Sequence, residues 1–290
     1  MRGEWNGLQA LILNYFPYAY YIHCFAHRLQ LALVGASKAV VPLNGFFNKF
    51  ILVINNICAS CKCIEQLKIA RASDIEYLID IEELETGKGL NQMVTLQRPG
   101  DTRWGSHYKS VSNLIKLFSP TSEVLLKIMG EGNPSQKVEA ESAYEVLISF
   151  EFVFILHFVN ETMRMTDKLY QALQNQSQDI LYAMHLVSST KKLIQQFRDE
   201  KWDDILATVI SFCKERGLDV PNMNARYVAR FGRSHHQQKD FRNEHYYKVD
   251  IFNAGIDSQL QELNHWFSEL AMELLTLISA LDSREAYESF

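Results

Sequence analysis

The sequence predicts a mainly α-helical protein. Apolar residues recur at intervals of three and four over most of its length, which is typical of amphipathic helices. The segment "AYYIHC" (19–24) alone has the aromatic and β-branched pattern of a short strand. Glycine and proline gather chiefly at 86–101 and 129–137, where we expect loops.

The first elements are expected in the order helix, strand, helix. Residues 3–14 predict a helix, and "FAHRLQLALVGASK" predicts another directly after the strand. Pro42 interrupts it, and a further helix is expected over 43–67. The acidic segment 73–85 keeps helical apolar spacing, so we interpret its carboxylates as the solvated face of an ordinary helix.

The remaining helices lie in the second and last thirds of the chain. The apolar run "VLISFEFVFILHFV" (146–159) predicts a buried helix. Segment 217–250 has weak periodicity and predicts a long loop. Helices are expected over 102–118, over 138–216 with breaks near Asn175 and Asp199, and over about 255–281.

Composition excludes several classes of protein. The 290 residues carry a net charge of −5, so any contact with nucleic acid has to come from a local basic patch. The five cysteines are odd in number and irregularly spaced, which favours reduced thiols in an intracellular protein over a disulfide framework. No run of about 18 apolar residues occurs, so we expect no membrane span.

Cys24 and His27 lie three positions apart at the expected strand-to-helix corner. They fit three interpretations: two ligands of a zinc site, a nucleophilic Cys–His pair, or a packed pair that braces the corner. A zinc site needs about four ligands. Cys58, Cys61 and Cys63 are conceivable partners, but we expect them to be buried in a helix. The packed pair is therefore the favoured interpretation.

Two stretches have the composition of a nucleic-acid contact. In "RPGDTRWGSHYKS" (98–110), Arg103, Trp104 and Lys109 combine cations with an aromatic ring, although a tryptophan at a helix start is also a common core anchor. The loop from Arg226 to Lys248 carries six Lys/Arg, two acids and three histidines, with aromatic residues interleaved. This loop suits phosphate contact, and equally a solvated basic loop.

These segments together resemble the hAT superfamily of DNA transposases. "CFAHRLQLAL" is similar to the Cys-x-x-His segment of that family, and "DTRWGSHYKSV" to its Thr-Arg-Trp segment. Residues 177–228 and 245–287, and the opening "MRGEWNGLQALI", resemble plant transposase-derived proteins of the zinc-finger MYM-type 1-like group. The resemblance covers essentially the whole chain.

The resemblance implies an RNase H-like core split by a large all-helical insertion. Residues 1–60 would be the C-terminal part of the first RNase H-like segment, with Cys24 and His27 as a structural motif. Residues 61–290 would be the helical insertion domain, with the long loop at 217–250. Because strand 19–24 would lack neighbours, we expect the first 60 residues to be poorly packed.

The resemblance also implies cut-and-paste DNA transposition, in which three acidic residues hold two divalent metal ions. The segments that carry these acids do not occur within residues 1–290. We therefore expect a truncated, catalytically inactive protein with no catalytic residue, metal site or cofactor. Arg103, Trp104 and Lys109 are the expected DNA contacts, with the tryptophan stacking against a flipped-out base.

Binding is then the activity we expect. The partners are DNA, as for a domesticated regulatory module, or intact transposase-like relatives, as for a helical interaction scaffold. We expect no membrane and no small-molecule substrate. The resemblance alone implies a location in the nucleus.

Overall fold

The computed structural model describes residues 8–17, 25–80, 95–96, 104–173, 180–228 and 241–268. The protein is mainly α-helical, as predicted, and the described residues include no strand, only one isolated antiparallel bridge. The expected strand 19–24 and most of the loop 86–101 lie outside the described residues. The elements are α1 (Leu8–Tyr15), α2 (Phe25–Ala39), α3 (Val41–Ile57), α4 (Cys61–Asp80), α5 (Trp104–Lys116), α6 (Phe118–Glu131), α7 (Pro134–Leu147), α8 (Phe150–Leu173), α9 (Ile180–Glu200), α10 (Trp202–Glu215), α11 (Asn243–His245), the π-helix η1 (Tyr246–Asn253) and α12 (Ala254–Trp266).

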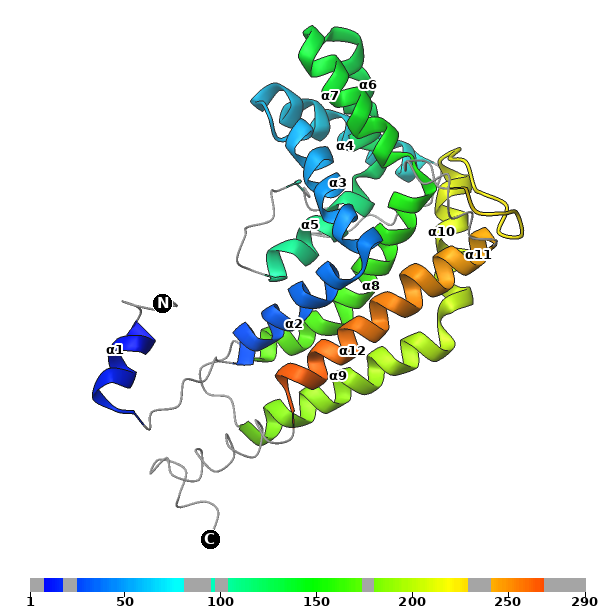
Figure 1. Cartoon of the computed structure of the whole chain (residues 1–290). Helices are drawn as coiled ribbons and strands as arrows, with labels where there is room; N and C mark the ends of the chain where they lie inside the picture. Colours follow the sequence, from blue (N-terminus) through cyan, green and yellow to red (C-terminus); the bar gives the residue numbers. More distant parts are fainter. Residues whose placement is uncertain are drawn as a thin grey trace.

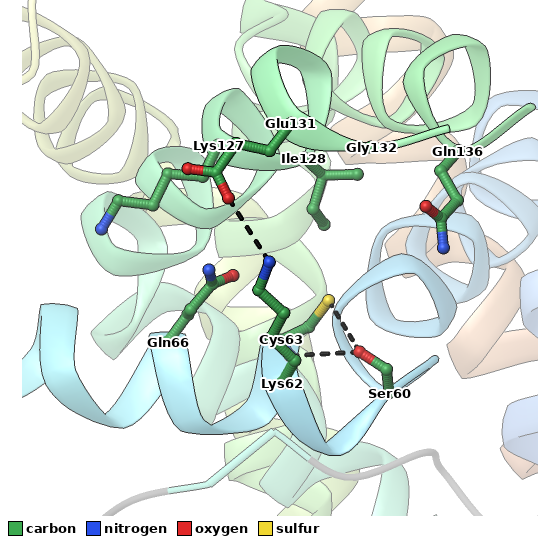
Figure 2. A pocket seen from close by; sticks show the side chains of 9 residues that line it. All are labelled: Ser60, Lys62, Cys63, Gln66, Lys127, Ile128, Glu131, Gly132 and Gln136. Carbon is green, nitrogen blue, oxygen red and sulfur yellow. Dashed lines mark hydrogen bonds and ion pairs between the residues drawn. The ribbon is translucent and has the colours of Figure 1, made fainter. Parts of the chain in front are cut away.

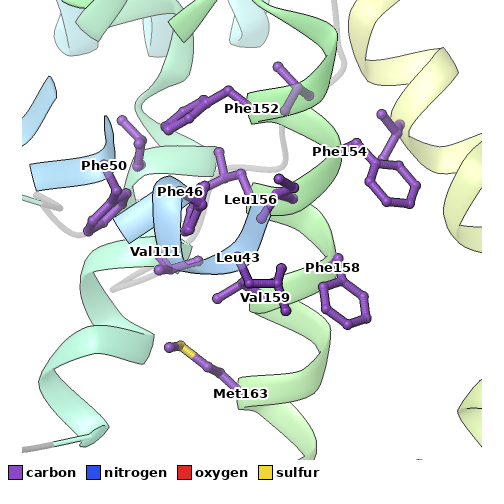
Figure 3. Close-up of a cluster of buried hydrophobic side chains, with 14 of the residues drawn as sticks. Leu43, Phe46, Phe50, Val111, Phe152, Phe154, Leu156, Phe158, Val159 and Met163 are labelled. Atoms are coloured by element: carbon purple, nitrogen blue, oxygen red, sulfur yellow. The ribbon is translucent and has the colours of Figure 1, made fainter. Parts of the chain in front are cut away.

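Helix α8 runs through the middle of the molecule and carries much of the core (Figure 1). Every residue from Phe152 to Val159 is buried, which confirms the buried helix predicted over 146–159 from residue 150 onward. Residues 146–149 instead form the end of α7 and the break before α8. Figure 3 shows these side chains meeting those of α3, and the rings of Phe46 and Phe152 lie 5.2 Å apart. Because the apolar residues cover the whole circumference of this stretch, it has no face toward solvent.

Helices α2 and α12 lie side by side although more than 200 positions separate them (Figure 1). The Ser258 hydroxyl donates to the Ala36 carbonyl at 3.2 Å. A Cβ atom on Gly255 would lie 2.8 Å from the Phe158 ring and 3.0 Å from Leu43, so α12 approaches α8 and α3 closely. At the end of α12, the Arg28 guanidinium donates to the Trp266 carbonyl at 3.2 Å.

The expectation that the first 60 residues pack poorly is wrong for residues 25–57. Leu29 and Leu33 of α2 and Phe50 and Ile54 of α3 are almost completely buried, in the same core as α8 and α12. Amphipathic helices can bury their apolar faces against other helices and need no sheet partner. Within the described residues, one core therefore crosses the expected boundary at residue 60.

Helices α4, α6 and α7 lie together at one end of the molecule (Figure 1). The expected loop 129–137 is wrong in extent, because α6 continues to Glu131 and α7 begins at Pro134. Asn133 is the reason for the early start. Its side chain accepts from the Gln136 amide at 2.9 Å, while the Gln136 side chain accepts from the Asn133 amide at 3.1 Å. This capping box lets the helix begin within the Gly- and Asn-containing segment.

The single helix expected over 43–67 is in fact two. Helix α3 ends at Ile57, and Ser60 begins α4 by accepting a hydrogen bond from the Cys63 amide at 3.2 Å. The backbone amides in the first turn of a helix have no carbonyl partner within the helix, and a serine hydroxyl in this position accepts a hydrogen bond from one of them. The break near Asp199 is confirmed, since Lys201 separates α9 from α10.

The last eight residues of the long loop expected over 217–250 are helical. Helix α10 ends at Glu215, and two residues later Gly217 has a φ of +65°, which suits glycine. The Leu218 amide donates to the Cys213 carbonyl at 2.9 Å. An irregular segment follows as far as Val228, and helical structure resumes at Asn243. Residues 229–240 lie outside the described residues. The helix expected over about 255–281 ends earlier, because α12 stops at Trp266 and Phe267 is not helical. Residues 269–281 lie outside the described residues.

Candidate nucleic-acid interface

The first expected DNA contact lies at the start of α5. Trp104 is the first residue of this helix, whereas Arg103 and the position of the Trp104 side chain lie outside what the structure describes. Lys109 is exposed one turn further on. The structure thus places one of the three expected contacts on the surface and leaves the role of the other two as a prediction.

The surroundings of Lys109 are of mixed charge. The pKa of Asp167 on the adjacent α8 is raised mainly by burial, against smaller opposing effects of the Gln171 side chain and Lys109. Arg164 donates to the Glu161 carboxylate at 2.8 and 3.0 Å. Two carboxylates and two cations therefore share this flank, so it has no net excess of positive charge to attract phosphate.

The Cys24–His27 pair is described in part. Cys24 lies outside the described residues, and His27 is exposed in the first turn of α2. The expectation that the three conceivable zinc partners are buried is wrong, because Cys61 is exposed and Cys58 and Cys63 are only partly buried. Nowhere in the described ranges do three or more His, Cys, Asp or Glu side chains gather as a metal site would require.

Cys63 of α4 lines a small pocket of about 110 Å³ (Figure 2). The Ser60 hydroxyl donates to the Cys63 sulfur at 3.1 Å, and Lys62 pairs with Glu131 at 3.4 Å across the pocket. Cys58 points elsewhere, toward the Leu96 carbonyl at 3.7 Å. The sulfurs of Cys58 and Cys63 therefore contact different partners.

The second basic stretch forms a stem. The Tyr227 amide donates to the Phe241 carbonyl and the Asn243 amide to the Ala225 carbonyl, each at 2.9 Å. These two bonds flank the bridge between Arg226 and Arg242. We call residues 225–227 and 241–243 the arginine stem. In an antiparallel pair of this type the two opposed side chains project from the same face, and their Cα atoms lie about 4.5 Å apart.

Both arginines of the stem are exposed. Like charges placed directly opposite each other on paired strands are destabilising. The backbone nevertheless holds these two residues as cross-strand neighbours, although sixteen positions separate them in sequence. Guanidinium groups match the geometry of phosphate oxygens, so two arginines at opposed positions suit contact with a phosphate.

The aromatic residues beside the stem stack on one another. The Tyr227 ring lies 4.0 Å from that of Tyr246 and 5.4 Å from that of Phe241. The Tyr247 ring packs 5.1 Å from Phe150 of the core. These rings hold the stem against the helices, so phosphate contact by the arginines fits this region better than base stacking by its aromatic residues.

Glu151 in the first turn of α8 anchors this aromatic stack. Its carboxylate accepts from the Tyr246 hydroxyl at 3.2 Å and from the Lys49 ammonium at 3.0 Å. Burial, followed by the negative charge of Glu151, raises the pKa of Tyr246 well above its usual range. Tyr246 therefore keeps its proton at neutral pH and acts as a hydrogen-bond donor.

The two basic regions lie apart. In Figure 1 α5 and the yellow segment that leads into the arginine stem are on different sides of α8. The sequence identified both regions but gave no sign of the Arg226–Arg242 pairing or of the anchor formed by Lys49 and Glu151. Both features depend on contacts between distant segments.

No protein-family model matches the chain, and no solved structure is significantly similar to it. Among the described helices, none is by itself both long and apolar enough to cross a lipid bilayer.

Proposed function

We propose that this chain is part of an hAT-type transposase-derived protein and that it acts by binding DNA, without catalysis of its own. The arginine stem is the proposed contact with the phosphate backbone. The observation that carries the proposal is the pairing of Arg226 and Arg242, two exposed cations on opposed positions of one antiparallel pair. Phosphate contacts supply most of the affinity of proteins that bind DNA without regard to sequence.

The family assignment in this proposal rests on the Cys-x-x-His and Thr-Arg-Trp segments of the sequence. The mainly helical fold agrees with a helical insertion over residues 61–290. The proposed RNase H-like part, residues 1–60, rests on the resemblance alone, because the described residues include no strand and share one core across residue 60. On the same basis the protein acts in the nucleus, uses no metal ion or other cofactor, and takes no small-molecule substrate.

Arg103, Trp104 and Lys109 form a proposed second contact. Lys109 is exposed and Trp104 begins α5, so a strand of DNA could meet both at one end of that helix. The mixed charge beside Lys109 makes this the weaker of the two contacts. Trp104→Ala should lower affinity for single-stranded DNA, because stacking contributes about 1–3 kcal/mol per base.

The first experiment measures binding of the full chain to a labelled DNA duplex by fluorescence anisotropy over a range of salt, from about 50 to about 200 mM. We expect binding that weakens steeply as salt increases. The double variant Arg226→Ala/Arg242→Ala should bind more weakly, and the slope of log affinity against log salt should fall by about 2, because two phosphate contacts are lost.

A matched control is available on the same chain. Lys168→Ala/Lys192→Ala removes two exposed cations from α8 and α9, away from the stem, and should leave the slope nearly unchanged. An equal loss in both double variants would show that only total charge matters. No binding at low salt, or metal-dependent nicking of DNA by the purified wild-type chain, would overturn the proposal.

An intact transposase-like relative is the second proposed partner. Tyr182 and Leu193 of helix α9 are exposed to solvent, with 55% and 51% of their surfaces accessible. Exposed large apolar residues on one helix are compatible with packing against another chain. Co-purification of this chain with a full-length relative, lost in Tyr182→Ser/Leu193→Ser, is the expected result. A chain that stays monomeric in the mixture would exclude this partner.

A further inference from the structure

An open pocket of about 430 Å³ lies where α6, the end of α7 and the turn after α10 meet. Its volume falls within the range of known ligand pockets. The apolar part of its lining combines one buried ring with partly exposed side chains, of which Leu126 is 46% exposed. The apolar residues of the lining are Phe118, Leu126, Tyr144, Ile148 and Leu218.

The charged residues of the lining are mostly acidic. Glu123, Glu215 and Asp219 are exposed carboxylates around the pocket, and Arg216 is its one cationic residue. The Arg216 guanidinium is engaged within the protein: it lies 3.7 Å above the Phe212 ring and donates to the Phe212 carbonyl and to Glu215, each at 3.3 Å.

Two of the carboxylates also have partners. Glu123 pairs with Lys127 at 2.8 Å, but Lys127 lines the separate pocket beside α4. Glu215 accepts from the Ser211 hydroxyl at 2.9 Å as well as from Arg216. Asp219 is exposed beyond the end of α10. The three acids therefore face two cations, Arg216 and Lys127, which leaves an excess of one negative charge around the pocket.

The end of α10 adds further negative potential. This helix ends at Glu215, directly at the pocket, and a helix C-terminus carries the negative end of the backbone dipole. The amides of Gly217 and Leu218 satisfy the carbonyls of Lys214 and Cys213. The potential at the pocket therefore favours a cation, while its lining favours an apolar group.

We propose that this pocket binds a basic peptide segment of a partner protein. One lysine or arginine side chain of the peptide lies among Glu123, Glu215 and Asp219. An aliphatic side chain next to it covers Leu126 and Ile148. Long cationic side chains match such a site because their methylene groups pack on apolar surface while the charged end meets the carboxylates. This site shares no residue with the arginine stem and does not depend on DNA binding.

The test uses the full chain and a fluorescein-labelled peptide Leu-Arg-Leu-Lys-Leu, with binding followed by anisotropy. Gly-Arg-Gly-Lys-Gly carries the same charge without the aliphatic groups and should bind more weakly. The variants Glu123→Gln/Asp219→Asn and Leu126→Ser should each weaken binding of the leucine peptide by at least about fivefold. All three positions are exposed, so folding is retained, and circular dichroism checks this.

The matched control is Glu141→Gln/Asp203→Asn, which removes two exposed carboxylates that do not line the pocket. It should bind the leucine peptide as the wild-type chain does. An equal loss in this control, equal affinity for the two peptides, or no binding of the leucine peptide at millimolar concentration would each overturn the proposal.

Discussion

Glu151 and Tyr246 share a hydrogen bond of 3.2 Å although 95 positions separate them in the sequence. Tyr246 also stacks on Tyr227 of the arginine stem. The hydroxyl of one tyrosine thus connects the stem to the first turn of α8.

Tyr246→Phe tests this connection. The phenylalanine keeps the stack and removes the bond to Glu151, so we expect a loss of about 1 kcal/mol in the free energy of unfolding. Urea denaturation measures it. Tyr182→Phe, at an exposed position of α9, should change stability by less than about 0.5 kcal/mol. A loss of the same size in both variants would contradict the role of the bond.

Two glycines should respond in opposite ways to alanine. Gly255→Ala places a methyl group 2.8 Å from the Phe158 ring and should destabilise the protein by about 1–3 kcal/mol. Gly45→Ala, within α3, meets no atom within 4 Å and should stabilise by about 0.5–1 kcal/mol, because alanine favours helix. Thermal unfolding compares the two. A stabilising Gly255→Ala would show that α12 lies further from α8 than described.

His157 should make stability depend on pH. Burial, more than any other cause, lowers the pKa of His157 in the folded protein, with a smaller contribution from Arg216. The unfolded chain, with a histidine pKa of about 6.5, then binds this proton more readily, so stability is present above about pH 6.5 and is lost as pH falls through the folded-state pKa. His157→Gln should flatten the change in stability between about pH 7 and about pH 5.

The control for this prediction is His185→Gln, because His185 is exposed on α9. Urea denaturation at several pH values should give the wild-type slope for this variant. If His157→Gln kept the same slope as the wild-type chain, the histidine would not be the group that titrates.

Cysteine labelling should separate buried from exposed thiols. Burial raises the pKa of Cys213 to about 11, and its side chain is fully buried. Since the thiolate is the reactive form, Cys213 should not react with an aromatic disulfide reagent at about pH 8 until the protein unfolds. Exposed Cys61 should react in the folded state. Cys61→Ser should therefore remove rapid labelling that Cys213→Ser retains, and rapid loss in Cys213→Ser would contradict this.

Periodicity predicted the helices well where their packing is regular. The run 146–159 identified the buried part of α8, because residues with no polar face have to be enclosed. It failed at 243–250, where the sequence predicted a loop. Residues Tyr246–Asn253 form a π-helix, which has more residues per turn than an α-helix, so a search at the α-helical spacing finds weak periodicity there.

The start of α7, which was predicted incorrectly, is marked by a local sequence signal. Asn133, Pro134 and Gln136 are a cap, a first-turn proline and a capping-box residue, which together mark a helix start inside the expected loop. The candidate site had a weaker signal. The composition of 226–248 indicated a basic region, but the pairing of Arg226 with Arg242 depends on a stem that local sequence does not specify.

The pairing of α2 with α12 sets an order of events in the cell. Ala36 is made 222 residues before Ser258, its partner on α12. At synthesis rates of roughly 5–20 residues per second, the apolar face of α2 waits roughly 10 to 45 seconds for that partner. During this interval Leu29 and Leu33 are open to other chains and to chaperones. A truncated messenger RNA that lacks the codons of α12 would be translated into a chain in which the apolar face of α2 stays exposed. Such a chain would aggregate or be degraded.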